Sequence, residues 1–243
     1  MQTLYVVKKL EAYPTFTVNT VAHIIKKDIP YTKVFLNRLK KRGVISHLQR
    51  NVYTVHDDPL IIASRIVWPS YISLWAAFRY HNLTEQIPHT ISVVTTRCKN
   101  RKTIVVAQTT IRFEHLRPAW FFGFEKTTLK DVEIFIAEPE KALIDAVLLK
   151  KISTTEIYML LKENINQLSS EKIIQYILQT KNKALMKRFG WMLESLHCNQ
   201  AVRLQKFSYK TLLPLDYSRP RKGKKDTTWG LLVNIGGVDA TKI

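Results

Sequence analysis

The chain has 243 residues, 46% of them hydrophobic, and its 38 Lys and Arg against 19 Asp and Glu give a formal net charge of +19. This length and hydrophobic content exclude a disordered chain and suffice for one large domain or two smaller ones, while the charge favours a polyanionic partner such as nucleic acid, or an acidic protein. Because the sequence shows neither a signal-peptide core nor a run of roughly 20 apolar residues that spans a bilayer, we expect a cytoplasmic protein with no membrane partner.

Two short helices are expected first, within residues 1–57, a segment with 10 basic and 3 acidic side chains. Apolar residues recur at helical spacing up to Leu10. Thr17 is suited to cap a second helix that ends near Ile25, because its side-chain oxygen can accept a backbone N–H of the first turn.

A third helix and a hairpin follow. Pro30 fits the first turn of this helix, where a missing N–H costs nothing, and Gly43 suits the left-handed position that ends it. From Val44 the sequence alternates and turns at residues 49–51, which predicts two short strands. Three helices followed by a small hairpin are the order of a winged helix-turn-helix, so residues 1–57 are predicted to be a DNA-binding domain of this type.

The third helix is predicted to divide into a packed face and a DNA-facing one. Thr32, Phe35, Leu36 and Leu39 form the apolar stripe. In a winged helix-turn-helix, the opposite face enters the major groove, which is about 12 Å wide, and the wing lies near the backbone or the minor groove. The candidate DNA-binding residues come from this face, the wing and the turn before the helix: Lys26, Lys27, Tyr31, Lys33, Asn37, Lys40, Lys41, Arg50 and Asn51. Short three-helix units also serve as dimerisation or scaffold modules, and a lysine-rich face can simply be solvated.

Residues 58–243 are predicted to form an α+β effector domain, and the fold class of the whole chain is α+β. The effector domain is divided into a mixed part (58–150), a helical part (151–208) and a basic C-terminal extension (209–243). The predicted helices are Leu60–Val67, Tyr71–His81, one opened by Glu138 and Pro139, Thr154–Glu163, Ser170–Gln179 and Lys183–Leu196. The predicted strands are Thr90–Thr96, Thr103–Ala107, Thr110–Glu114, Val132–Ala137 and Trp229–Ile235.

Enzymatic chemistry finds little support in the sequence. No glycine falls in a phosphate-binding loop, the seven histidines are scattered, and Cys98 and Cys198 are expected to be buried thiols. Glu138, Glu140 and Asp145 could hold a divalent ion in a metal-dependent nuclease, but Asp145 is better explained by a surface ion pair with Lys141 at i, i+4. We therefore expect a protein that is not an enzyme and needs no metal or cofactor.

An aromatic run, Trp120-Phe121-Phe122-Gly123-Phe124, has two interpretations. It could stack the bases of a single strand, although such a dense run is more typical of a core around a tight turn.

Two middle stretches resemble the AbiEi family of antitoxins and transcriptional regulators. The first, PSYISLWAAFRYHNLTEQIPHTISVVTT (69–96), matches at Tyr71, Ile72, Ser73, Leu74, Ala76 or Ala77, His81, Leu83, Thr84, Gln86, Ile87 and Pro88. The second, IAEPEKALIDAVLL (136–149), matches at Ala137, Glu138, Pro139, Glu140, Lys141, Ala142, Leu143 and Asp145. The wing at Asn51-Val52-Tyr53 and the helix at 183–196 are also similar to that family. Trp75 stands where the family has a small residue, and nothing after Leu213 matches.

This resemblance implies an autorepressor that binds the promoter of its own operon through an N-terminal winged helix. It also implies an antitoxin that opposes a nucleotidyltransferase-type toxin, usually encoded next to it, without a stable protein complex. A stand-alone regulator with no toxin to oppose is the alternative. The last third of the chain, residues 151–243, has 16 basic and 7 acidic side chains and offers a basic face for the RNA substrate of such a toxin or for an acidic protein.

Overall fold

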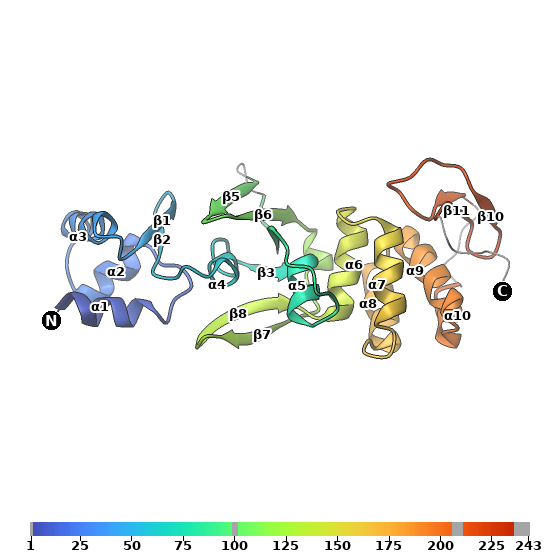
Figure 1. The fold of residues 1–243 in the computed structure, drawn as a ribbon, viewed down its shortest axis with the longest axis horizontal. Coiled ribbons are helices and arrows are strands. Elements are labelled where there is room, and N and C mark those ends of the chain that lie inside the picture. Colours follow the sequence, from blue (N-terminus) through green and yellow to red (C-terminus); the bar gives the residue numbers. More distant parts are fainter. Residues whose placement is uncertain (1, 99–101, 206–210, 236–243) are drawn as a thin grey trace. The chain divides into compact units, whose positions relative to one another are not determined.

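A computed structural model gives the structure of residues 2–98, 102–205 and 211–235. Runs of helices and runs of strands follow one another along the chain, which confirms the predicted α+β class (Figure 1). The chain divides into two compact units: unit 1 consists of residues 1–77 and 86–137, and unit 2 of residues 78–85 and 138–243. The domain boundary predicted between residues 57 and 58 stays a prediction. In the part of the chain that is described, no helix has the length and apolar character needed to cross a bilayer.

Unit 1 begins with three helices and a hairpin. They are α1 (Gln2–Leu10), α2 (Val18–Ile25), α3 (Ile29–Lys41), β1 (Ser46–Gln49) and β2 (Val52–Thr54). Thr17 caps α2 as predicted, because its side-chain oxygen accepts the Thr20 N–H at 3.3 Å. Pro30 lies in the first turn of α3, and Gly43 follows that helix with φ +70°, so both predicted ends are confirmed. The hairpin begins at Ser46, two residues later than expected.

The three helices and the hairpin share one apolar core. Leu36 and Leu39 of α3 are 1% exposed and pack with buried residues of α1 and α2. The buried side of α1 is formed by Val6 and Leu10, one turn apart, whereas Leu4 is 78% exposed. A bridge between Phe16 and Tyr53, with both N–H···O distances at 2.9 Å, ties the segment before α2 to the hairpin. Tyr53 of the hairpin is also packed against this core.

The rest of unit 1 is a mixed six-stranded sheet. Its strands are β3 (Ser70–Ser73), β4 (Thr90–Thr95), β5 (Thr103–Val106), β6 (Thr109–His115), β7 (Phe124–Leu129) and β8 (Val132–Ala137). Their order is β5-β6-β4-β3-β8-β7, with β3 parallel to β8, β4 parallel to β6, and the other pairs antiparallel. Two short helices, α4 (Pro59–Ala63) and the 3₁₀ helix η1 (Pro118–Trp120), complete this part, and α4 lies against β4, β6 and β8.

Two predictions for this region are wrong, and one strand was missed. The helix expected over 71–81 starts as the central strand β3 and becomes helical only in α5 (Trp75–Tyr80). Residues 70–74 are all buried, and a short buried run has no periodicity that separates helix from strand. The helix expected over 60–67 ends at Ala63, and strand β7 was not predicted.

Unit 2 contains a group of helices that lie side by side in Figure 1. They are α6 (Pro139–Leu149), α7 (Thr154–Glu163), α8 (Ser170–Thr180), α9 (Lys183–Ser195), the 3₁₀ helix η2 (Asn199–Ala201) and α10 (Val202–Gln205). The predicted bounds of α7 are confirmed, and those of α8 and α9 are right to within one residue. Local caps explain this accuracy: Ser153 and Ser169 each accept a backbone N–H from the first turn of the next helix.

A small three-stranded sheet lies beyond these helices in the chain. It is formed by β9 (Leu213–Pro214), β10 (Lys224–Asp226) and β11 (Leu231–Val233), in the order β10-β11-β9. Trp229 is 1% exposed and donates its indole N–H to Glu194 of α9 at 2.5 Å. Because β11 covers only Leu231–Val233, the strand predicted over 229–235 is shorter than expected. Residues 206–210 and 236–243, which belong to the predicted helical part and C-terminal extension, lie outside the described residues.

The two cysteines do not match their prediction. Cys98 is exposed and Cys198 is partly exposed, so neither is a buried thiol.

Candidate nucleic-acid interface

The cap of α3 sets which of its side chains point outward. Asp28 begins the helix by accepting the Tyr31 N–H at 2.9 Å, and the Thr32 hydroxyl donates to the Asp28 carbonyl oxygen at 2.7 Å. Thr32, Leu36 and Leu39 are buried and Phe35 is half-buried, so the other positions from 31 to 41 are turned to solvent. Lys33, Asn37 and Lys40 are exposed there, at positions i, i+4 and i+7 of one stripe. The predicted division of the helix into a packed and an outward face is confirmed, although Phe35 is only half-buried.

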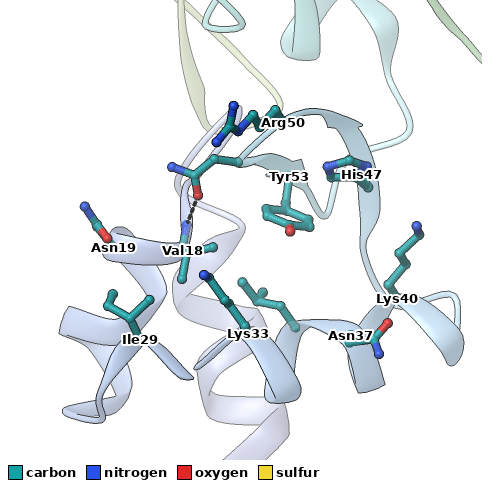
Figure 2. A pocket seen from close by; sticks show the side chains of 11 residues that line it. Val18, Asn19, Ile29, Lys33, Asn37, Lys40, His47, Arg50 and Tyr53 are labelled. Carbon is teal, nitrogen blue, oxygen red and sulfur yellow. Dashed lines mark hydrogen bonds between the residues drawn. The ribbon is translucent and has the colours of Figure 1, made fainter. Parts of the chain in front are cut away.

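A hollow of about 580 Å³ lies between this outward face of α3 and the hairpin. Figure 2 shows Lys33, Asn37 and Lys40 rising from α3, with Arg50 and His47 facing them from the hairpin. The remaining lining residues are Val18, Asn19, Ile29, Leu36, Asn51 and Tyr53. The described residues that line this hollow, the α3–hairpin hollow, include four Lys, Arg or His and neither Asp nor Glu. Its field is therefore positive and suits an anion.

The nine predicted DNA-binding residues are all exposed, but the structure separates them. Five line the α3–hairpin hollow: Lys33, Asn37, Lys40, Arg50 and Asn51. Lys27 and Tyr31 line a different, smaller cavity beside α1, where the lysine nitrogen lies 5.9 Å from the centre of the tyrosine ring. Lys26 and Lys27 border a shallow depression along α2 and the turn that follows it, and Lys41 lines none of these cavities.

Asn51 has a structural task in the hairpin turn. It adopts a left-handed conformation with φ +59°, which asparagine tolerates better than most residues. Its side-chain oxygen accepts the Val18 N–H at 3.1 Å, the dashed line in Figure 2. This bond satisfies a donor at the start of α2 that the helix itself leaves unpaired, and it locks the wing turn to α2.

Two further lining residues were missed by the sequence analysis. His47 lies on β1 with its ring 4.9 Å from that of Tyr53, and Asn19 lies in the first turn of α2. Burial along β1 gives no signal for His47, because Ser46 and His47 are both exposed. No local signal marks Asn19, since only the folded hairpin brings it to the same hollow as α3.

The three acidic residues considered for a nuclease are used by the protein itself. Glu138 accepts the Tyr176 hydroxyl at 2.7 Å and pairs with the Lys172 ammonium at 2.9 Å. One Glu140 oxygen accepts the Ser169 N–H at 2.9 Å, which links α6 to the start of α8. Within the described ranges, no group of three or more His, Cys, Asp and Glu side chains is arranged to hold a metal ion.

Asp145 forms the expected ion pair with Lys141, but not at the surface. Both side chains are 0% exposed, so the prediction of a surface pair is wrong. The apolar face of α6 is broad enough to bury this pair on neighbouring helices. Burial lowers the pKa of Lys141, and the Asp145 carboxylate opposes this shift by stabilising the ammonium.

Glu138 has a pKa below its ordinary value. Burial would raise this pKa, but the hydrogen bonds from Lys172 and Tyr176 outweigh burial because they stabilise the carboxylate. The same environment raises the pKa of Tyr176, first through burial and then through its bond to Glu138. The acid is therefore ionised at neutral pH, and its Oε2 is held by both partners.

The aromatic run packs on the sheet. The Phe124 ring stacks on buried Tyr71 with centres 4.6 Å apart, and the Phe121 ring lies 5.1 Å from the same tyrosine. Phe124 also meets Phe135 of β8, edge to face. These contacts favour the core interpretation over base stacking.

Comparison with known proteins gives a fold and no family. No family model matches the chain, and no curated protein matches it. The crystal structure of the RV2827C protein from Mycobacterium tuberculosis is similar, with a TM-score of 0.59, 10% sequence identity, and coverage of 89% of this chain and 85% of that chain. At this identity the similarity concerns the fold alone.

Proposed function

We propose that this chain is a DNA-binding transcriptional regulator whose α3 and β1–β2 hairpin act as the recognition helix and wing of a winged helix-turn-helix. The observation that carries the proposal is the α3–hairpin hollow, where Lys33, Lys40 and Arg50 converge on a surface without a carboxylate among its described lining residues. The net charge of +19 supports a polyanionic partner.

In this proposal each group in the hollow has a distinct task. Lys33 and Lys40 bind phosphates on either side of the groove that α3 enters, and they position the protein without reading sequence. Asn37 lies between them on the same stripe and offers an amide that can pair with an adenine edge. Arg50, at the tip of the hairpin, reaches the backbone or the minor groove. Asn51 supports the turn rather than the DNA.

The test compares two double variants that remove the same charge. Lys33→Ala with Lys40→Ala removes two cations from the hollow, and Lys8→Ala with Lys9→Ala removes two exposed cations from α1. Fluorescence anisotropy with a duplex from upstream of the protein's own gene measures the affinity at several salt concentrations. We expect the α3 pair to weaken binding and to reduce the slope of log K against log salt by about 0.9 for each phosphate that the variant no longer neutralises.

The α1 pair should leave both the affinity and the salt slope close to those of the unchanged protein. Equal losses of affinity in the two double variants would mean that the overall positive charge of the protein, rather than the hollow, accounts for DNA binding. Unchanged binding in the α3 pair would contradict the proposal outright.

We further propose that the regulated operon is the protein's own and that the chain is a non-enzymatic antitoxin against a nucleotidyltransferase-type toxin. The support is the resemblance of residues 69–96 and 136–149 to the AbiEi family. A nucleotidyltransferase in the adjacent reading frame, whose toxicity this chain relieves on co-expression, is the expected result. The α3 double variant should still relieve toxicity while losing repression. If the adjacent reading frame encodes no nucleotidyltransferase, the chain would instead be a stand-alone regulator.

A further inference from the structure

A second cationic cavity, of about 450 Å³, lies within unit 2, far along the sequence from the α3–hairpin hollow. Its lining residues come from the end of α6, the start of α9 and the segment around β9: Val147, Leu148, Lys150, Asn182, Ala184, Leu185, Arg188, Leu213, Pro214, Tyr217, Arg219 and Arg221. Four of these are Lys or Arg, and none of the described lining residues is Asp or Glu. We propose that this cavity binds the terminal phosphate of a nucleotide-sized ligand.

Arg188 is the fixed cation of this cavity. It is 7% exposed, and its guanidinium donates to the carbonyl oxygens of Leu215 and Pro214 at 3.0 and 3.1 Å. The guanidinium also lies 5.5 Å from the centre of the Tyr217 ring. Because its position is already set, little conformational entropy is lost when an anion approaches it.

Three exposed cations complete the site. Arg219 lies 3.8 Å from the Asp216 carboxylate, at the limit of an ion pair. That carboxylate already accepts bonds from Thr155 and Ser218, which hold the pKa of Asp216 below its ordinary value although burial opposes this. Lys150 and Arg221 form no ion pair with the described residues. These side chains can therefore close on a ligand without first breaking a strong pair.

The start of α9 adds to the positive field. Asn182 caps this 13-residue helix by accepting the Leu185 N–H at 3.1 Å, and Ala184 of the first turn lines the cavity. A helix N-terminus carries a partial positive charge that favours phosphate. It acts here together with the four side-chain cations and does not make the site alone.

The size and shape of the cavity select the ligand. Pockets for small ligands usually measure about 300–1,000 Å³, and a mixed wall of cations and apolar side chains suits a nucleotide better than a bare anion. The terminal phosphate can belong to a free nucleotide or to the 5′ end of a short strand.

Calorimetric titration of the full-length protein tests this site, with ADP, adenosine, and a trinucleotide with or without a 5′-phosphate as probes. We expect one-to-one binding of ADP or of the 5′-phosphorylated trinucleotide, and no binding of adenosine or of the 5′-hydroxyl trinucleotide. Binding of ADP assigns the site to a free nucleotide, and binding of the phosphorylated trinucleotide alone assigns it to a strand end.

Matched variants locate the binding. Lys150→Gln with Arg221→Gln should lower the affinity for the probe at least about tenfold, because each charge-assisted hydrogen bond contributes more than a neutral one. Lys162→Gln with Lys222→Gln removes the same charge from exposed positions that do not line the cavity, and it should leave the affinity unchanged. If the first double variant fails to fold, Arg219→Gln with Arg221→Gln replaces it.

The double variant Lys33→Ala with Lys40→Ala should have no effect on probe binding, which separates this site from the DNA proposal. Absence of binding by both phosphorylated probes, or equal losses from the cavity pair and its control, would overturn the inference.

Discussion

Charged side chains have opposite roles in α3 and α6. In α3, Lys33 and Lys40 are exposed, and they face a hollow rather than a protein partner. In α6, Lys141 and Asp145 are completely buried and pair with each other. The comparison shows that a charged residue suggests a ligand only when the fold leaves it accessible. The charged residues of α6 and its N-cap contact one another, α8 and the N-cap of α8 instead of a ligand.

The largest expected effect comes from breaking the buried pair of α6. Lys141→Met leaves the Asp145 carboxylate buried without its cation, and we expect a loss of about 3–5 kcal/mol in the free energy of unfolding. Urea denaturation followed by circular dichroism measures this change. Lys141→Met with Asp145→Leu replaces both charges by apolar groups and should recover most of the loss. If Lys141→Met were as stable as the unchanged protein, the buried pair would not stabilise α6, and the difference from the exposed cations of α3 would not hold.

Two glycines give a second comparison, between α9 and the turn that follows α3. A Cβ on Gly190 of α9 would overlap the ring of buried Trp229, whereas one on Gly43 after α3 would meet no atom within 4 Å. We expect Gly190→Ala to cost about 1–3 kcal/mol through overpacking. Gly43→Ala should cost about 1 kcal/mol, only because φ +70° disfavours a side chain. Tryptophan fluorescence should shift in the first variant alone, and a shift in both would contradict this difference.

Asn37 sharpens the division of labour within the α3–hairpin hollow. If its amide reads one base pair, Asn37→Ala should lose about 1–3 kcal/mol of discrimination at that position while keeping the salt dependence of binding. Selection of bound duplexes from a random library measures the preference. A uniform loss of affinity without any change in base preference would make Asn37 a backbone contact instead.

The smallest expected effect concerns pH and the pair of α6 with α8. Glu138 has a folded pKa below its ordinary value of 4.5, so its contribution to stability is present above that pH and is lost as the pH falls through the folded pKa. Because the ion pair with Lys172 is partly exposed, we expect this contribution to be at most about 1 kcal/mol. As the pH is lowered below 4.5, the thermal unfolding temperature should therefore fall less steeply for Glu138→Gln than for the unchanged chain. Identical acid profiles would show that Glu138 stabilises no more than its neutral counterpart.

Only part of the candidate site was accessible to sequence reasoning. The stripe of Lys33, Asn37 and Lys40 follows from helical periodicity once the apolar stripe is identified. The separation of Lys27 and Tyr31 from that stripe depends on where α1 packs, and the use of Asn51 by the Val18 N–H depends on how the hairpin meets α2. Those contacts join residues far apart in the chain, so no local pattern predicts them.

The sequence alone determined the α+β class, the Thr17 cap of α2 and the left-handed Gly43 that follows α3, because capping and left-handed turns involve bonds between residues at most a few positions apart. Tertiary structure decided that residues 70–73 form a central strand, that Phe121 and Phe124 pack on Tyr71, and that the Lys141–Asp145 pair is buried. Strand pairing and burial depend on partners that the chain brings together only when it folds. The same folding places cations from α3 and the hairpin around one hollow, and cations from α6, α9 and residues 219–221 around another.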